Sequence, residues 1–184
     1  MQFNLNWLSE YISIESPIEE MCDQLTMAGL EVDNYEKIYN KKNQEDYLIK
    51  LDLTPNRGDC FSIRGVAREL SILNNLKFQE PKIKEIPSSV LPNRKINIIK
   101  EAPSYIGRHI EKFANNKPTT DLVRERLEFS GVRLVDPIVD ITNYILLETG
   151  QPLHAFDQDK LNGDIFVRFA KTNERIILLE GEEV

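Results

Sequence analysis

VDPIVDITNYILLETGQPLHAFD, residues 135–157, joins an apolar segment to a polar cluster and then to a Pro-His loop. Within it, Asp140, Thr142 and Asn143 lie among Val, Ile, Tyr and Leu residues. A buried polar group without a hydrogen-bonding partner costs about 1–3 kcal/mol, so these side chains need partners in the protein or in a ligand. The combination predicts a pocket.

After Gly150 the chain turns through Gln151 and Pro152 and presents His154, one of only two histidines. Histidine is the side chain best suited to titrate near neutral pH, which makes His154 the candidate catalytic residue. The alternative is structural, because a His in a Pro-containing turn often only donates or accepts a hydrogen bond. Asp, Thr and Asn near a helix end are often caps. From the residues alone, both interpretations stay open.

The first part of the chain predicts helices and a strand. Ser16-Pro17 followed by two glutamates is a helix start, and Gly29 ends that helix. Residues 47–53 alternate apolar and polar residues, which predicts a strand. After the turn at residues 54–58, we expect Asp59 to cap a helix that ends near residues 74–75. We assign Arg57 and Asp59 a structural role, because no nucleophile or metal-ligand cluster accompanies them.

Prolines interrupt residues 77–93, which predicts a linker between an N-terminal unit, residues 1–76, and a second unit, residues 94–184. In the second unit, Thr119 or Thr120 is expected to cap a helix that ends at Gly131. The predicted strands of this unit are residues 95–100, 105–113, 165–169 and 175–179. Strands mixed with a few helices in no strict alternation indicate an α+β fold.

The composition is that of an ordinary soluble chain of 184 residues, 41% of them hydrophobic. No run approaches the roughly 20 apolar residues of a membrane span. The first residues also lack the basic start and apolar core of a secretory signal, so we expect a cytoplasmic protein with no membrane partner. Cys22 and Cys60 form no C-x-x-C pair, which predicts reduced, half-buried thiols and no metal site.

The net charge of −7 argues against bulk electrostatic attraction to nucleic acid, so no DNA partner is expected and any RNA contact must be local. The candidate positive positions are Lys41-Lys42, Arg94-Lys95, Arg124 and Arg126.

The quoted stretch contains D-x-T-N-Y, from Asp140 to Tyr144, and G-Q-P-x-H-A-F-D, from Gly150 to Asp157. This long motif with fixed spacing resembles the editing module of bacterial phenylalanyl-tRNA synthetase beta subunits. Two further blocks resemble the same family in the same order. They are residues 3–33, which include TMAGLEVD, and residues 51–70, which include TPNRGDC.

The resemblance implies a subunit of a ligase that charges tRNA with phenylalanine and hydrolyses mischarged tyrosyl-tRNA. In that family the alpha subunit forms the aminoacyl-adenylate with ATP and Mg²⁺, two alpha and two beta subunits assemble, and tRNA is bound. Carried over by motif, Thr142, Asn143, Pro152 and His154 line the editing pocket, and Arg133 lies at its edge. The resemblance implies no cofactor and no metal in this chain.

One departure from the family is large. Full-length beta subunits carry an OB-fold insertion between the two N-terminal blocks, whereas the interval here, near residues 34–47, is too short for one. The chain also stops at Val184, so we expect only part of the editing module and no activity of the chain alone. Two alternatives stay open: a non-catalytic subunit-association module, and a free-standing deacylase acting on mischarged tRNA.

Overall fold

The computed structural model describes residues 1–87, 91–92, 94–111, 117–178 and 181–184. These residues form helices and small sheets, which confirms the predicted α+β class. They group into two compact units, each built from two stretches of chain. The first comprises Met1–Lys84 and Ala114–Ala155, and the second comprises Glu85–Phe113 and Phe156–Val184.

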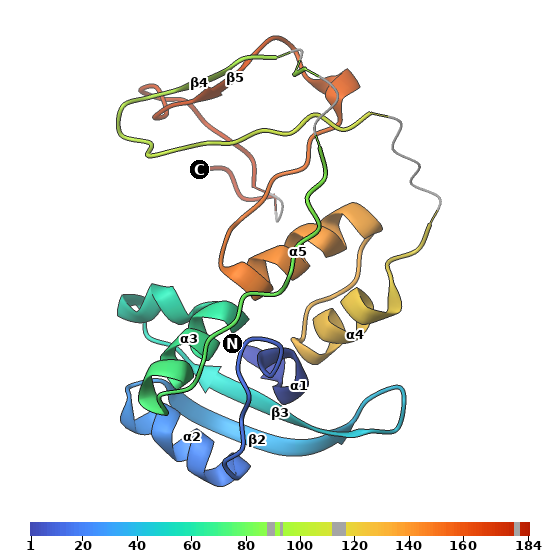
Figure 1. The fold of residues 1–184 in the computed structure, drawn as a ribbon. Coiled ribbons are helices and arrows are strands. Elements are labelled where there is room, and N and C mark those ends of the chain that lie inside the picture. Colours follow the sequence, from blue (N-terminus) through green and yellow to red (C-terminus); the bar gives the residue numbers. More distant parts are fainter. Residues whose placement is uncertain (88–90, 93, 112–116, 179–180) are drawn as a thin grey trace. The chain divides into compact units, whose positions relative to one another are not determined.

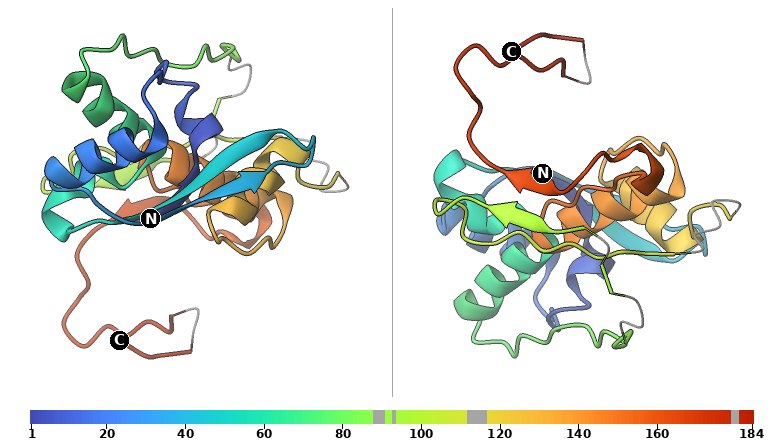
Figure 2. Two further views of the ribbon diagram at one scale, coloured as in Figure 1. Left: turned by 90° about the horizontal axis from the view of Figure 1, so that it is seen from below. Right: turned by 90° about the horizontal axis from the view of Figure 1, so that it is seen from above.

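The first unit contains a three-stranded antiparallel sheet in the order β1-β3-β2 (Figure 1). The strands are β1 (Gln2–Asn4), β2 (Glu31–Tyr39) and β3 (Glu45–Asp52). The strand predicted at residues 47–53 is the central strand β3. Most of the polar interval near residues 34–47 is strand. β2 and β3 form a long hairpin there (Figure 2).

Helices α1 (Leu5–Leu8), α2 (Ile18–Met27) and α3 (Ile63–Leu73) share one apolar core with the sheet. The apolar residues of α2 recur at helical spacing, so one face of the helix is buried, as predicted. Gly29 ends the helix with a φ of +84°, and the Leu30 N–H donates to the Leu25 carbonyl at 2.9 Å. The buried side chains of α2 are Ile18, Met21, Cys22 and Leu25.

The entry to α3 corrects one prediction. Asp59 does not cap this helix; Ser62 does, because its hydroxyl accepts a hydrogen bond from the Gly65 N–H at 3.0 Å. The turn predicted at residues 54–58 is a 3₁₀ helix, Pro55–Cys60, which places Asp59 too far before α3 to reach its first amides. The Asp59 carboxylate pairs with Arg57 instead.

Two further helices complete the first unit, α4 (Asp121–Phe129) and α5 (Pro137–Thr149). Thr120 occupies the N-cap position of α4 without a side-chain cap, and the Thr119 hydroxyl donates to Asp140 of α5. The predicted cap by either threonine is therefore wrong, because the Thr119 hydroxyl bonds to Asp140 and the Thr120 side chain makes no cap. Gly131 follows α4 with a φ of +70°, as predicted.

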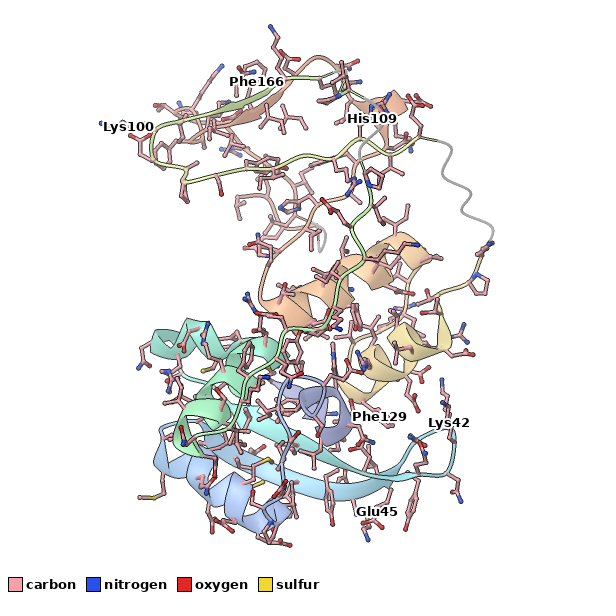
Figure 3. The ribbon with its side chains drawn as sticks, viewed as in Figure 1. Lys42, Glu45, Lys100, His109, Phe129 and Phe166 are labelled. Carbon is pink, nitrogen blue, oxygen red and sulfur yellow. The ribbon has the colours of Figure 1, made fainter. Side chains whose placement is uncertain are left out.

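Because α4 and α5 pack within the first unit, the observed grouping differs from the predicted units 1–76 and 94–184. The side chain of Gln2 in β1 donates to the carbonyl of Phe129, the last residue of α4, at 2.7 Å. Lys41 at the tip of the hairpin forms a salt bridge of 3.1 Å with Glu128 of α4. Figure 3 labels Phe129 and, beside Lys41, the hairpin residue Lys42.

The second unit contains a parallel pair of strands, β4 (Ile96–Ile98) and β5 (Ile165–Val167). Both lie inside predicted strands. Residues 105–111 form no strand, contrary to prediction, while 112 and 113 fall outside the described residues. In the segment predicted as the strand 175–179, Ile177 makes a single antiparallel bridge with Glu183, and residue 179 is not described. Within the described residues, no helix is long and apolar enough to cross a membrane.

Part of the predicted linker is held by contacts within the first unit. The ring of Phe78 stacks on Tyr11 with centroids 5.7 Å apart, and the Gln79 N–H donates to the Tyr11 carbonyl at 2.8 Å. Beyond it, Ile83 is 91% exposed and Ile86 is 68% exposed. Residues 88–90 and 93 lie outside the described residues, so a domain boundary at residues 77–93 stays a prediction.

Limited proteolysis tests that boundary. Thermolysin, which cleaves before large apolar residues, should cut first before Ile83 or Ile86, because both are exposed in a segment without helix or strand. Phe78 should resist, since its ring and the neighbouring amide are engaged. Mass spectrometry of the earliest fragments identifies the cut. A first cut within residues 135–157 would contradict the boundary.

Gly65 lies in α3 where a side chain has no space. A Cβ there would lie 2.0 Å from the Asp59 carbonyl oxygen and 2.9 Å from the Cys60 Cα. Ala favours a helix over Gly by about 1 kcal/mol. The clash is with backbone and outweighs that gain, so Gly65→Ala should lower the free energy of unfolding by about 2 kcal/mol.

Gly58→Ala is the matched control, because no atom lies within 4 Å of a Cβ at that position. It should change the free energy of unfolding by less than about 0.5 kcal/mol. Urea denaturation of both variants measures the difference. Equal stability of the two variants would show that the backbone before α3 moves aside.

Candidate functional site

Helix α5 carries the polar residues of the signature stretch, and local sequence defines both of its ends. Asp136 is the N-cap, since its carboxylate accepts from the N–H groups of Ile138 and Val139 at 2.8 and 3.1 Å. Pro137 occupies the first turn, where no N–H is needed. Gly150 ends the helix with a φ of +78°, a conformation that favours glycine. Thr142 and Asn143 therefore lie on a helix whose two ends are defined by local sequence.

Two of the three polar residues have partners within the protein. The Asp140 carboxylate is buried and accepts hydrogen bonds from the Val135 N–H, at 2.9 Å, and from the Thr119 hydroxyl. The Thr142 hydroxyl donates to the Val139 carbonyl at 2.8 Å. Asp140 therefore joins α5 to the segment before α4. Thr142 has used its proton, and its oxygen can still accept a hydrogen bond.

The structure brings the predicted site residues onto α5 and its two flanking segments, all within the first unit. Thr142 and Asn143 are half-buried neighbours in the helix. Pro152 and His154 are exposed in residues 151–157, which form neither helix nor strand. Arg133 is exposed in the connection between α4 and α5. That these five residues line one pocket stays a prediction.

Tyr144, the last residue of D-x-T-N-Y, has a role that sequence reasoning missed. Its ring stacks on Trp7 of α1 with centroids 5.1 Å apart, and its hydroxyl accepts from the Arg126 guanidinium at 2.7 Å. Burial raises the pKa of Tyr144 to about 12, so the phenol stays protonated and donates to Glu148 at 3.1 Å. The one sequence signal for this role was a tyrosine next to two predicted ligand-binding residues. The sequence did not indicate its partners, because they are distant along the chain.

Asp59, Cys60 and Glu69 have ligand atoms within 4.8 Å of one another. However, the Arg57 guanidinium lies among them. Its Nη2 donates to Asp59 at 3.2 Å, to the Cys60 sulfur at 3.0 Å and to Glu69 at 3.0 Å. A cation would have to replace that positive charge, so this cluster is a structural ion pair, in agreement with the structural role assigned to Arg57 and Asp59.

Both cysteines are free thiols and are buried, where half-buried thiols were predicted. Burial is the main cause that raises the pKa of each to about 11. Neither thiol is therefore a nucleophile at neutral pH.

Four of the six candidate RNA-binding cations make side-chain contacts within the protein. Lys41 pairs with Glu128, and Arg126 is buried against aromatic rings. Arg124 donates to the Thr119 carbonyl at 3.3 Å. Arg94, in the second unit, donates to the carbonyls of Gln158, Leu161 and Gly163. These contacts favour structural roles for all four side chains.

Comparison with known proteins agrees with the motifs. The family described as the B3/4 domain matches residues 101–184. The chain is 46% identical over 142 residues to the phenylalanine–tRNA ligase beta subunit of Idiomarina loihiensis, which covers 76% of this chain and 18% of that protein. It is 41% identical over 176 residues to the beta subunit of Acinetobacter baylyi, covering 94% of this chain and 21% of that protein.

The subunit of the same name from Pectobacterium atrosepticum is 43% identical over 159 residues, which is 85% of this chain and 19% of that protein. The chain thus spans about a fifth of the length of the curated relatives it matches. The predicted resemblance is confirmed, and the chain aligns with one part of each of these proteins.

The Arg57 ion pair makes a prediction about acid stability. The hydrogen bonds from Arg57 hold the pKa of Asp59 at about 2, below its ordinary value of 3.8. A lowered folded-state pKa stabilises the protein above about pH 4, and that contribution is lost as the pH falls toward 2. Arg57→Met should return the Asp59 pKa toward 3.8.

A carboxyl-carbon NMR titration measures this pKa directly. Arg68→Met is the control, because its guanidinium is 3.7 Å from the Asp59 carboxylate and makes the more distant salt bridge. It should shift the pKa of Asp59 less than Arg57→Met does. Equal shifts in the two variants would mean that the positive charge near Asp59, and not its hydrogen bonds with Arg57, lowers the pKa of Asp59.

Proposed function

We propose that this chain, which resembles phenylalanine–tRNA ligase beta subunits, is the part of such a subunit that contributes to hydrolysis of mischarged tyrosyl-tRNA. The observation that carries the proposal is the signature stretch at residues 135–157, within a resemblance that covers most of the chain. As part of a ligase, the chain would support charging of tRNA with phenylalanine in the cytoplasm. ATP and Mg²⁺ would be used by the partner alpha subunit.

Selective hydrolysis answers a physical problem in charging tRNA. Tyrosine differs from phenylalanine by one hydroxyl group, and a hydrophobic synthetic pocket rejects an added hydroxyl only weakly. A second site that hydrogen-bonds the tyrosine hydroxyl can remove the error. Such a site needs a few polar groups in fixed positions on a rigid element.

The chemistry of the five predicted residues suits this task. Thr142 would accept a hydrogen bond from the ligand, because its proton is used by Val139. The amide of Asn143 can both donate and accept, which fits an amino acid ester. Pro152 would form a rigid apolar wall. The exposed guanidinium of Arg133 suits a phosphate of the tRNA end.

His154 is the candidate for the hydrolytic step. It would position or polarise the attacking water, a role that requires hydrogen-bond reach to that water. In this chain His154 is exposed in a segment without regular structure. A hydrolytic site works best when its groups are held in place and shielded from bulk water, so we expect the chain alone to be a poor catalyst.

The activity test uses tyrosyl-tRNA specific for phenylalanine and follows loss of the ester. The chain alone should hydrolyse it near the spontaneous rate and should not form phenylalanyl-tRNA. When the chain replaces the matching segment of the Acinetobacter baylyi beta subunit, in complex with its alpha subunit, hydrolysis should be retained. In that complex His154→Ala should lower hydrolysis at least about tenfold, while charging with phenylalanine continues as the internal control.

The same assay separates the alternatives. Hydrolysis by the chain alone that His154→Ala abolishes would make it a free-standing deacylase. A complex that assembles, charges tRNA and hydrolyses the ester equally well with and without His154 would contradict the proposed site and leave subunit association as the function of this region.

A further inference from the structure

We propose that Arg126 and Trp7 are positioning residues for the site on α5. The part of the inference that concerns ligand binding rests on the proposed function. The part that concerns the orientation of α5 does not. The residues that carry it, here called the Arg126 cluster, are Trp7, Glu10, Arg126, Tyr144 and Glu148.

Aromatic contact is the first element of the cluster. The rings of Trp7 and Tyr144 stack with 17° between their planes. The Arg126 guanidinium lies 4.9 Å from the centre of the Trp7 ring and 5.8 Å from that of Tyr144. A planar cation over aromatic faces is attracted by their negative charge density, more strongly where water is excluded. Trp7 is fully buried, so the contact is of the stronger kind.

Hydrogen bonds fix the direction of the guanidinium. One terminal nitrogen of Arg126 donates to the Tyr144 hydroxyl at 2.7 Å, and the other donates to the Glu10 carboxylate. The Tyr144 hydroxyl in turn donates to Glu148 at 3.1 Å, and the Trp7 indole N–H lies 3.5 Å from the same carboxylate oxygen. Glu10 therefore contacts the buried guanidinium directly, and Glu148 is connected to it through the Tyr144 hydroxyl.

This arrangement joins three helices that are far apart in sequence. Trp7 belongs to α1, Arg126 to α4 and Tyr144 to α5. The Arg126 side chain is 8% exposed. A buried charge that loses its partners is strongly unfavourable, so the guanidinium resists any movement of α5 that would separate it from Tyr144.

The consequence for the site follows from helix geometry. Successive residues are about 100° apart around a helix axis, so fixing Tyr144 inward turns Asn143 to one side and Thr142 to nearly the opposite face. Asp140, four residues before Tyr144, is buried on the same inward face and is held by Val135 and Thr119. Two anchors one turn apart therefore determine the rotation of α5.

The tolerance of such a site is small. Side-chain atoms lie about 5 Å from the helix axis, so a rotation of about 20° displaces them by about 2 Å. A binding constellation needs positions held within about 0.5 Å. Arg126 and Trp7 both contact Tyr144, and through it they act on the neighbouring Thr142 and Asn143.

The test combines two readouts in the full chain. The first is the set of NMR chemical shifts of the Thr142 methyl and the Asn143 side-chain amide. The second is the affinity for a stable amide-linked tyrosyl-adenosine, measured by calorimetry. Arg126→Met should shift both NMR signals and weaken the affinity about tenfold, the factor expected when one hydrogen bond loses its alignment. Arg126→Lys, which keeps the charge but not the planar fork, should recover part of both effects.

Arg64→Met is the matched control, since Arg64 pairs with Glu80 and belongs to α3. It should leave the Thr142 and Asn143 signals unchanged. The single tryptophan of the chain reports whether the cluster is intact, because its fluorescence senses loss of the guanidinium contact. Should Arg126→Met fail to fold, Glu10→Gln removes only the charge of one partner at the edge of the cluster and should give a smaller shift of the same signals.

Unchanged Thr142 and Asn143 signals in a folded variant whose Trp7 fluorescence has changed would overturn the positioning role. If the wild-type chain binds no tyrosyl-adenosine while the NMR signals shift as expected, the proposed function fails and the positioning of α5 stands. Weaker binding without any shift of these two signals would also refute the inference, because the loss would then come from elsewhere in the protein.

Discussion

Burial of the Trp7 indole is the constraint on which the first unit depends. The ring is fully buried. Arg126 and Tyr144, which contact it, lie more than one hundred residues further along the chain. An aromatic ring of this size buries more apolar surface than most other side chains, so leaving one face of it in water would be costly. Tyr144 and Arg126 cover it, and α4 and α5 therefore belong to the same unit as the N-terminal sheet.

This constraint gives α5 two roles. Its inward residues, Asp140 and Tyr144, connect the helix to the segment before α4 and to α1. Its neighbouring residues, Thr142 and Asn143, are half-buried and carry the groups assigned to ligand recognition. A rigid helix serves this purpose better than a loop, since packing on one face fixes the direction of groups on the others. The signature D-x-T-N-Y thus combines anchoring and recognition in five residues.

The Arg57 ion pair uses similar chemistry to connect other elements. There a guanidinium connects a 3₁₀ helix to α3 through Asp59 and Glu69, and it also reaches the carbonyl of Ala28 at the end of α2. In both clusters an arginine satisfies several acceptors at once, which its planar fork of donors allows. The structure also brings the ligand atoms of Asp59, Cys60 and Glu69 together, and the Arg57 guanidinium among them makes the cluster an ion pair instead of a cation site.

The sequence by itself determined the α+β class, the C-terminal ends of α2 and α4, and the family resemblance of residues 135–157, because these depend on local periodicity, on Gly29 and Gly131 at helix ends, and on a contiguous motif. Only the tertiary structure decided that Ser62 caps α3, that the Thr119 hydroxyl serves Asp140, and that Tyr144 is an anchor. The Thr119 and Tyr144 contacts depend on which groups distant in sequence come within hydrogen-bonding or stacking distance, and the Ser62 cap depends on where the preceding 3₁₀ helix ends and α3 begins. A sequence pattern indicates that a polar or aromatic group needs a partner, and the tertiary structure determines which group that partner is.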